Sequence, residues 1–270
     1  YSTAIVSAYG GAGAEGYYGG CGNGGSAWAG GIAGRNYGSI TTSYSTGTIS
    51  ASGGNGGPGS SQGYRGDGHS GGIAGQNAGA ITTSYSTARI ISSAGSNGQA
   101  GYSYAGGLVG FNGNNITNCY ATGSVAAGSY GTSYAGGLVG WHNSDTVSYS
   151  YSTGYIINGG TMGGLVGYNT ASVSNSYYDQ DTSGRSDNTG KGVPKTTALM
   201  MTQATFSGWD FTDTWGIVQD ETYPYLKWKY TSTPKGISGI VYSGQGTSPV
   251  ANAAVGLAIN GSIITTLGTV

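Results

Sequence analysis

The stretch GGLVGFNGNNITNCYATGSV, residues 106–125, carries the pattern that decides the fold. Similar stretches begin at the Gly pairs 30–31, 71–72, 136–137 and 163–164. Successive pairs are 41, 35, 30 and 27 residues apart, whereas the second Gly precedes the Tyr of the repeat by 13 residues in four of five copies. In the fourth copy the distance is 14, which one inserted residue near His142 explains. A constant core with insertions of variable length is the signature of a solenoid.

The local composition of the repeat predicts strands. ITTSYS and VSYSYS alternate with a period of two, and no window shows the 3.6-residue period of a helix. Helical repeats are therefore excluded, and we expect an all-β solenoid. Each coil should contribute three short strands: GG[IL][AV]G, the strand that ends in SYST, and a short strand five residues beyond its Tyr. The segments between units, such as residues 51–70, are interpreted as loops.

Stacked coils would place equivalent residues in columns about 4.8 Å apart. Three apolar columns are expected: Ile32, Ile73, Leu108, Leu138, Leu165; Ile40, Ile81, Ile116, Val147, Val173; and Val6, Ile49, Ile90, Val125, Ile156. A Tyr column would hold Tyr1, Tyr44, Tyr85, Tyr120, Tyr151 and Tyr177, and an Asn column at a turn would hold Asn36, Asn77, Asn112, Asn143 and Asn169. Asn tolerates the left-handed backbone, and stacked amides can bond along a ladder. One coil cannot bury its apolar face alone, but stacked copies can.

The composition excludes several classes of protein. The chain has 270 residues with 57 Gly, 23 Tyr and 7% charged residues, against about 25% charged and about 7% Gly in ordinary domains. Its net charge is −1 and it has no basic run, so nucleic acid is not an expected partner. No apolar run approaches the roughly 18 residues of a membrane span. The regular apolar and aromatic positions favour an ordered fold over a disordered one.

The repeat resembles the GLUG motif of large secreted surface proteins, including filamentous-haemagglutinin-like adhesins. GGLVG, the Asn, the Ile and SYxTG recur in order over about residues 1–178, and segment 179–230 is similar to the tail that closes such arrays. This resemblance implies a right-handed parallel β-helix on an exported protein, located at the cell surface. Because residues 1–7, YSTAIVS, match YSTGTIS, the chain is expected to start in mid-repeat.

Three domains are expected. Residues 1–178 form the solenoid, and residues 179–230 form a cap with one short helix, N-capped by Thr196 or Thr197, and Trp/Tyr-rich strands. Four tryptophans are expected near this capped end: Trp141, Trp209, Trp215 and Trp228. Residues 231–270 hold a linker and a partial β-sandwich module, whose PVANAAVGL pattern resembles the start of carboxypeptidase-regulatory-like, transthyretin-like domains.

Candidate sites for chemistry are few. His69 and His142 lie in different coils, and no column of acids repeats, so we expect no catalytic residues, no cofactor and no enzyme activity. Asp179, Asp181 and Asp187 are the one acidic cluster and the candidate Ca²⁺ ligands, although they lack a full calcium-loop pattern, which favours a solvated loop.

Three other features allow covalent modification or contact. Asn115 and Asn260 begin glycosylation sequons, and Cys21 and Cys119 either pair or remain free thiols. Tyr residues in the Gly/Ser-rich insertions either stack on glycans or proteins, or pack down over the coils.

The expected function is therefore structural and adhesive. An exported, extracellular solenoid would present its Gly/Tyr-rich loops to neighbouring surface proteins or glycans. A second hypothesis is a subunit of an extracellular filament or sheath, in which copies of the chain stack end to end or complete the C-terminal module by strand addition. A minor alternative is a polysaccharide-binding or polysaccharide-cleaving β-helix.

Overall fold

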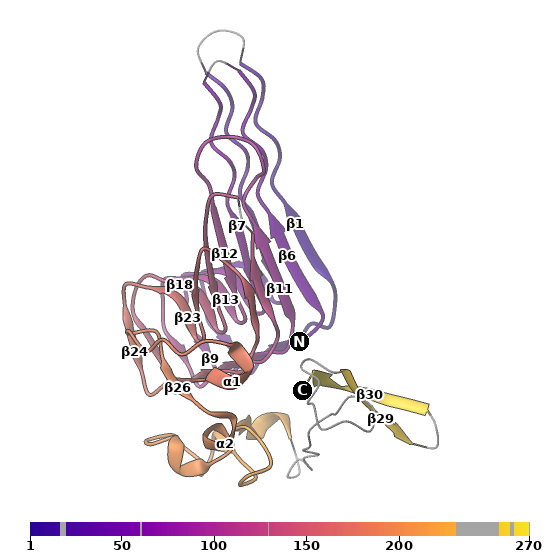
Figure 1. Cartoon of the computed structure of the whole chain (residues 1–270), viewed down its shortest axis with the longest axis vertical. Coiled ribbons are helices and arrows are strands. Elements are labelled where there is room, and N and C mark those ends of the chain that lie inside the picture. Colours follow the sequence, from indigo (N-terminus) through magenta and orange to yellow (C-terminus); the bar gives the residue numbers. More distant parts are fainter. Residues whose placement is uncertain (17–19, 60, 129, 231–253, 260–261, 270) are drawn as a thin grey trace. The chain divides into compact units, whose positions relative to one another are not determined.

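The computed structural model describes residues 1–16, 20–59, 61–128, 130–230, 254–259 and 262–269. The chain divides into two compact units, Tyr1–Ser232 and Thr233–Val270. The first unit is a right-handed parallel β-helix followed by its cap, as the sequence predicts (Figure 1). Each coil contributes five short strands, and equivalent strands of successive coils pair in parallel to form five sheets, here numbered I to V in chain order.

The strands of the five sheets have the following bounds. Sheet I contains β2 (Ala27–Gly30), β7 (Gly68–Gly71), β12 (Tyr102–Gly106), β17 (Thr132–Gly136) and β22 (Thr161–Gly163). Sheet II contains β3 (Ala33–Asn36), β8 (Ala74–Asn77), β13 (Val109–Asn112), β18 (Val139–His142) and β23 (Val166–Asn169). Sheet III contains β4 (Ile40–Thr41), β9 (Ile81–Thr82), β14 (Ile116–Thr117), β19 (Thr146–Ser148) and β24 (Ser172–Ser174). Sheet IV contains β5 (Tyr44–Ser45), β10 (Tyr85–Ser86), β15 (Tyr120–Ala121), β20 (Tyr151–Ser152), β25 (Tyr177–Asp179) and β26 (Val193–Lys195). Sheet V contains β1 (Val6–Tyr9), β6 (Thr48–Ser52), β11 (Arg89–Ser93), β16 (Val125–Ala127) and β21 (Ile156–Asn158).

The expected columns are present, with one exception. Ile81 pairs with Ile116, Ile90 with Val125 and Tyr85 with Tyr120, and these residues are buried. The exception is the Asn column, in which His142 rather than Asn143 lies between Asn112 and Asn169. The inserted residue therefore follows position 142. Asn112 Nδ2 lies 3.0 Å from His142 Nδ1, so the imidazole replaces an amide in the ladder.

Three predicted strands per coil become five because two corners interrupt them. One corner lies at the Gly pair, between sheets I and II. The other lies between sheets III and IV and is formed by left-handed residues that are not Gly: Thr42, Thr83, Asn118, Tyr149 and Asn175, with φ between 44° and 56°. This conformation is unfavourable for most side chains. The residue after the corner supports it, since Ser150 Oγ donates to Ser148 O at 2.7 Å and accepts from Cys119 N at 3.1 Å.

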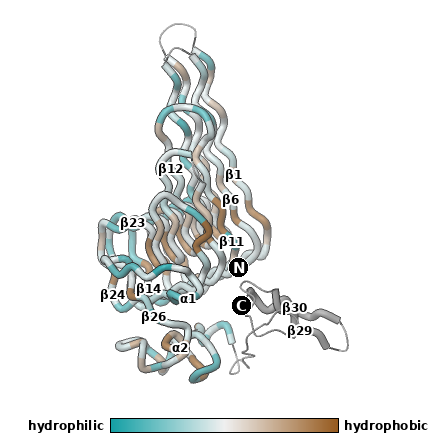
Figure 2. The backbone as a smooth tube through the Cα atoms, viewed as in Figure 1, coloured by the Kyte–Doolittle hydropathy of each residue, from teal (hydrophilic) through white to brown (hydrophobic). Residues whose placement is uncertain are grey.

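The Gly-rich segments carry no strand between Ser52 and Gly68 in the described residues, as the loop prediction for residues 51–70 expects, but hydrogen bonds join them into an arm, and the ends of that segment belong to β6 and β7. The arm extends from sheets I and V (Figure 1), and its near-white colour in Figure 2 reflects its neutral hydropathy. Backbone hydrogen bonds join its neighbouring segments at every third residue: Gly10 N to Ser52 O, Gly13 N to Asn55 O and Gly16 N to Pro58 O, at 2.8, 2.8 and 3.3 Å.

This three-residue repeat is that of polyproline II chains bonded side by side. A Cβ added to Gly13 would lie 1.9 Å from Gly22 O and 2.7 Å from Gly57 N, so a larger residue does not fit there. Gly is needed at every third position for the same reason as in collagen, where the neighbouring chain approaches too closely for a side chain.

The cap segment contains α1 (Gln180–Ser183), α2 (Thr197–Met200), the 3₁₀ turns η1 (Gln203–Thr205) and η2 (Lys227–Lys229), and the antiparallel pair β27 (Trp215–Gly216) and β28 (Tyr225–Leu226). Thr196 caps α2, as one of the two predicted candidates. Part of the segment crosses the last coil, where Val166 N donates to Lys191 O and Asn169 Nδ2 donates to Gly190 O.

Most of the cap, however, runs back along the side of the solenoid over the Tyr column. Trp209 and Trp215 pack on Tyr151, and Trp228 packs on Tyr85. Their indole N–H groups bond to three residues of the left-handed corner: Trp209 to Asn175 O, Trp215 to Asn118 Oδ1 and Trp228 to Thr83 O, at 2.9, 3.3 and 2.9 Å. Trp141 takes no part in this layer, which corrects the expectation that four tryptophans gather at the cap.

In the second unit the structure describes one antiparallel hairpin, β29 (Ala254–Ile259) with β30 (Ser262–Thr269). The linker and most of the expected β-sandwich module, including Asn260, lie outside the described residues.

Candidate functional site

The candidate metal ligands do not form a site. Among the described residues, no group of three or more His, Cys, Asp or Glu side chains is placed to hold a metal ion. Asp179 caps α1 and also accepts hydrogen bonds from Thr197 Oγ1 at 2.7 Å and Tyr223 Oη at 2.6 Å. Asp187 instead lies 3.6 Å from Lys191. Asp179 and Asp187 therefore have structural partners of their own.

The two cysteines are free and do not pair. Cys119 is fully buried in the solenoid core, and burial raises the pKa of its thiol to about 12. Cys21 lies in the arm and donates to Pro58 O at 3.1 Å. The side chain of Asn115 is exposed but accepts a hydrogen bond from Thr146 N at 3.2 Å. Its glycosylation stays a prediction.

The most distinctive surface feature is an aromatic corner between sheets I and II. One row comes from sheet I, at the position two residues before each Gly pair: Trp28, His69, Tyr104, Tyr134 and Thr161. The second row comes from sheet II, at the position after GGxxG: Arg35, Gln76, Phe111, Trp141 and Tyr168. Both rows follow the axis of the solenoid, with one residue of each row per coil.

The rings of the two rows contact each other across the corner. Tyr104 stacks on Trp141 across the corner with 5.7 Å between ring centroids, and within the sheet II row Phe111 meets Trp141 edge-on at 5.1 Å. Within the sheet I row, His69 stacks on Tyr104 with 4.5 Å between ring centroids. Between the rows, Tyr134 stacks on Tyr168 at 5.0 Å. Offset and edge-on arrangements at these distances are the favourable ones for aromatic pairs. The corner therefore holds one continuous aromatic surface.

The third Gly of GGxxG explains why the rows lie so close. A Cβ added to Gly75 would lie 2.8 Å from His69 O, and one added to Gly140 would lie 2.9 Å from Ala105 O. Only Gly allows sheet II to approach sheet I this closely. The predicted columns do not include these aromatic rows, although the fixed offsets of both rows from the Gly pair are visible in the sequence.

The exposure of the rings varies along the corner. His69 and Tyr104 are 8% and 4% exposed, whereas Tyr168 is 37% exposed. Among the tyrosines of the Gly/Ser-rich insertions, Tyr104 packs down and Tyr102, at 39%, faces outward. Packing down over the coils is thus confirmed for Tyr104, whereas contact of the exposed tyrosines with glycans or proteins stays a prediction.

Three buried polar atoms in the corner have no hydrogen-bond partner: Trp28 Nε1, Trp141 Nε1 and His69 Nδ1. Burial, with the nearby Arg35 guanidinium, lowers the pKa of His69 to about 3. The Arg35 guanidinium lies 4.5 Å from the centre of the Trp28 ring, and its Nε donates to Gln76 Oε1. Because the imidazole stays neutral at physiological pH, Arg35 is the one charged member of the two rows.

The low pKa of His69 predicts an acid-sensitive contribution to stability. In the unfolded chain the imidazole binds a proton below its ordinary pKa of 6.5, whereas in the folded chain it does so only near pH 3. The free energy of unfolding should therefore fall as the pH drops from about 6.5 towards 3. His69→Phe keeps a ring in the stack but cannot titrate, so its urea midpoint should fall less between pH 7 and pH 4 than that of the native chain. Equal falls in both proteins would contradict the prediction, and His142, present in both, cancels from the comparison.

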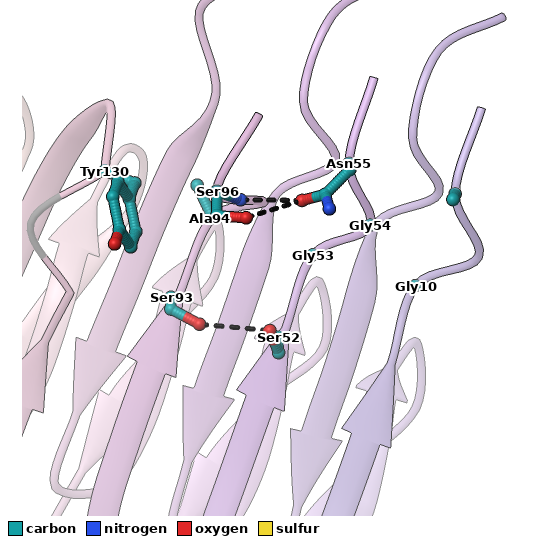
Figure 3. Close-up of a pocket in the computed structure, with 10 residues that line it drawn as sticks. Gly10, Ser52, Gly53, Gly54, Asn55, Ser93, Ala94, Ser96 and Tyr130 are labelled. Carbon is teal, nitrogen blue, oxygen red and sulfur yellow. Dashed lines mark hydrogen bonds between the residues drawn. The ribbon is translucent and has the colours of Figure 1, made fainter. Parts of the chain in front are cut away.

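A second surface feature is a hollow of about 380 Å³ at the base of the arm. Figure 3 shows Tyr130 at one side and the polar residues of the floor. Ser93 Oγ donates to Ser52 Oγ at 3.1 Å, and Asn55 Oδ1 accepts from Ser96 N at 2.8 Å. None of the ten lining residues is charged. Because the polar groups of its floor already bond to one another, this hollow has fewer groups free to contact a ligand than the aromatic corner has.

Comparison with known proteins shows that the chain carries GLUG repeats. The profile described as the GLUG motif matches residues 28–50 and 101–126. A protein of Evansella cellulosilytica named as a Gly-rich membrane protein is 43% identical over 99 residues, which cover 33% of this chain and 11% of that protein. The chain therefore spans about a tenth of the length of this relative. The resemblance of residues 231–270 to carboxypeptidase-regulatory-like domains stays a prediction.

Among solved structures, one from Bacteroides ovatus named as an immunoglobulin A1 protease is similar at 24% identity and a TM-score of 0.49. The similarity covers 70% of this chain and 57% of the other. Among the described residues of this chain, no helix is both long and apolar enough to cross a bilayer.

Proposed function

We propose that this chain is the rigid solenoid part of an exported adhesive protein of the cell surface, and that it binds its partner through the aromatic corner. The GLUG repeats support a surface role, as does the name of the Gly-rich relative, which points to the cell envelope. The proposed role is one of binding rather than catalysis.

The observation that carries this proposal is a difference between the Tyr column of sheet IV and the aromatic corner. The Tyr column of sheet IV is covered by the chain's own tryptophans, so that Tyr151 is only 2% exposed. The corner between sheets I and II has no such cover from the described residues, and Tyr168 remains 37% exposed. Since exposed and half-buried aromatic rings that gather on one surface commonly mark an interaction site, the open corner is the surface we expect to be offered to a partner.

The scaffold suits adhesion in two further ways. Parallel strands in register and the Asn ladder hold the rings rigidly, so little conformational entropy is lost on binding. The chain has few charges, so electrostatic repulsion does little to oppose close contact with a surface. End-to-end stacking through the last coil would have to displace the segment around Lys191 that crosses it.

Adhesion of beads coated with the full chain tests this proposal. Beads would be applied to mucin layers, bacterial cells and polysaccharide gels, and the detachment force would be measured under flow. Trp141→Ala and Tyr168→Ala should each reduce retention several-fold on every surface that the native chain binds. Tyr155→Ala is the matched control, because this Tyr is 47% exposed but lies outside the corner. If the corner variants adhere as well as the native chain, the corner is not the adhesive surface.

A further inference from the structure

We infer that the ligand of the aromatic corner is an uncharged, extended polysaccharide that lies along the axis of the solenoid. This inference rests on the proposed function and adds the class of partner. It follows from the direction of the two rows, their chemical composition and their charge.

The direction of the rows favours a linear polymer. Each row offers one side chain per coil, and successive coils are about 4.8 Å apart. Phe111, Trp141 and Tyr168 are successive members of the sheet II row that are not fully buried, and their ring centroids are 5.1 and 5.6 Å apart. A chain of repeated sugar units can place successive rings against successive coils. A globular protein without such a repeat would match the rows at only a few positions.

The composition of the rows suits sugar rings. The two rows hold five large aromatic rings besides the imidazole of His69 and the ring of Trp28, together with polar groups at Gln76 and Thr161. Aromatic faces carry negative charge density, and the C–H edges of a sugar ring carry the complementary positive charge. The amide of Gln76 and the hydroxyl groups of Tyr134 and Tyr168 add groups able to bond to sugar hydroxyls.

The unpaired polar atoms show that packing alone does not account for the corner. A buried donor or acceptor without a partner destabilises the folded chain. Trp28 and Trp141 each hold a buried, unpaired N–H, and His69 holds an unpaired Nδ1, at positions where Phe would pack without that cost. The presence of these large polar rings is explained if the corner binds its ligand through the faces of the rings, rather than using the rings only for packing.

The charge of the corner favours an uncharged polymer. Of the ten positions, only position 35 carries a charge, and Arg35 is held at one end of the rows by Gln76 and the Trp28 ring. The imidazole of His69 is neutral, as described above. An acidic polysaccharide would need a line of cations, and the two rows supply one cation.

Affinity electrophoresis of the full chain in gels that contain soluble polysaccharides tests this inference. Neutral polymers such as xyloglucan, β-glucan and mannan would be compared with heparin and polygalacturonate. We expect retardation by at least one neutral polymer and little by the acidic ones. Titration with oligosaccharides of increasing length should show at least tenfold tighter binding for a hexasaccharide than for a disaccharide, with little change between 50 and 500 mM salt.

Two variants separate the corner from other surfaces. Trp141→Ala should weaken binding of the neutral polymer at least tenfold, whereas Tyr155→Ala should leave it unchanged. Trp141→Phe keeps an aromatic face and should restore most of the affinity that Trp141→Ala loses. If the Ala variant weakened binding only through lost packing, a smaller rescue would be expected from Phe. Unfolding midpoints of all variants establish that each one is folded.

The outcomes distinguish this inference from the proposed function. Corner-dependent adhesion of beads with no binding to any neutral polymer would overturn the inference and indicate a protein partner, while the adhesive role would stand. Binding that acidic polymers share and that salt abolishes would also overturn it. Adhesion that survives the corner variants would overturn the proposed function itself.

Discussion

Trp215→Ala is expected to destabilise the solenoid strongly, by about 3–5 kcal/mol, the usual cost of truncating a buried aromatic side chain to Ala. Trp215 is fully buried and contacts Tyr120, Tyr151 and Trp209. Its removal leaves a cavity over the Tyr column and leaves Asn118 Oδ1 without the indole N–H that it accepts. The effect should therefore reach the middle coils, far from the last one.

Urea unfolding followed by near-ultraviolet circular dichroism checks this prediction. Because solenoids can unfold in parts, the comparison should use the midpoint of each transition. Leu199→Ala is the matched control from the same segment, since Leu199 is 46% exposed and its loss should change the midpoint little. If Trp215→Ala and Leu199→Ala shift the midpoint equally, the cap does not hold the Tyr column in the way described.

Gly13→Ala and Gly11→Ala are expected to have opposite effects on the arm. A Cβ at position 13 would lie 1.9 Å from the backbone of Gly22, whereas one at position 11 would meet nothing within 4 Å. Forcing a methyl group into a closely packed site costs about 1–3 kcal/mol. Replacing Gly with Ala where the backbone allows it stabilises by about 0.4–1 kcal/mol, because the unfolded chain loses freedom.

Hydrogen exchange measures this difference locally. In Gly13→Ala the amides of Gly13, Gly22 and Gly57, which bond across the arm, should exchange roughly ten- to a hundredfold faster, in line with about 1–3 kcal/mol. The amides of sheets II and III should be unaffected, because those sheets form a separate part of the coil. Gly11→Ala should leave exchange unchanged or slow it. Equal exchange in the two variants would show that the arm is not bonded at every third residue.

The sequence was most informative where a repeat and a simple period coincide. The columns of Ile90, Tyr85 and Asn77 follow from one alignment of the Gly pairs, because residues at equal positions in stacked coils must lie side by side. Thr196 as the cap of α2 follows from local chemistry alone. These predictions are confirmed because each depends on neighbours whose positions the repeat itself defines.

The sequence was least informative where the conformation is rare for the residue that adopts it. Thr42 and Thr83 make a left-handed corner that propensity alone would not place at Thr, and Ser84, which follows Thr83, supports it through a bond to another coil. His142 takes an Asn position because an imidazole nitrogen can accept the same ladder bond as an amide oxygen. The left-handed corner and the imidazole at position 142 both depend on groups that only the stacking of successive coils brings together.

By itself, the sequence determined the solenoid, its register and the buried columns, because equivalent residues of a repeated strand-forming unit lie side by side when successive coils stack in register. Tertiary structure alone decided which aromatic residues would be covered. The segment around Trp215 folds back over one row, and the approach of sheet II to sheet I at Gly75 and Gly140 brings the second row together and leaves it open. Whether a ring is buried or exposed depends on what packs over it. The covering segment is distant in the sequence, since Trp228 lies 145 residues from Thr83, to which its indole N–H donates.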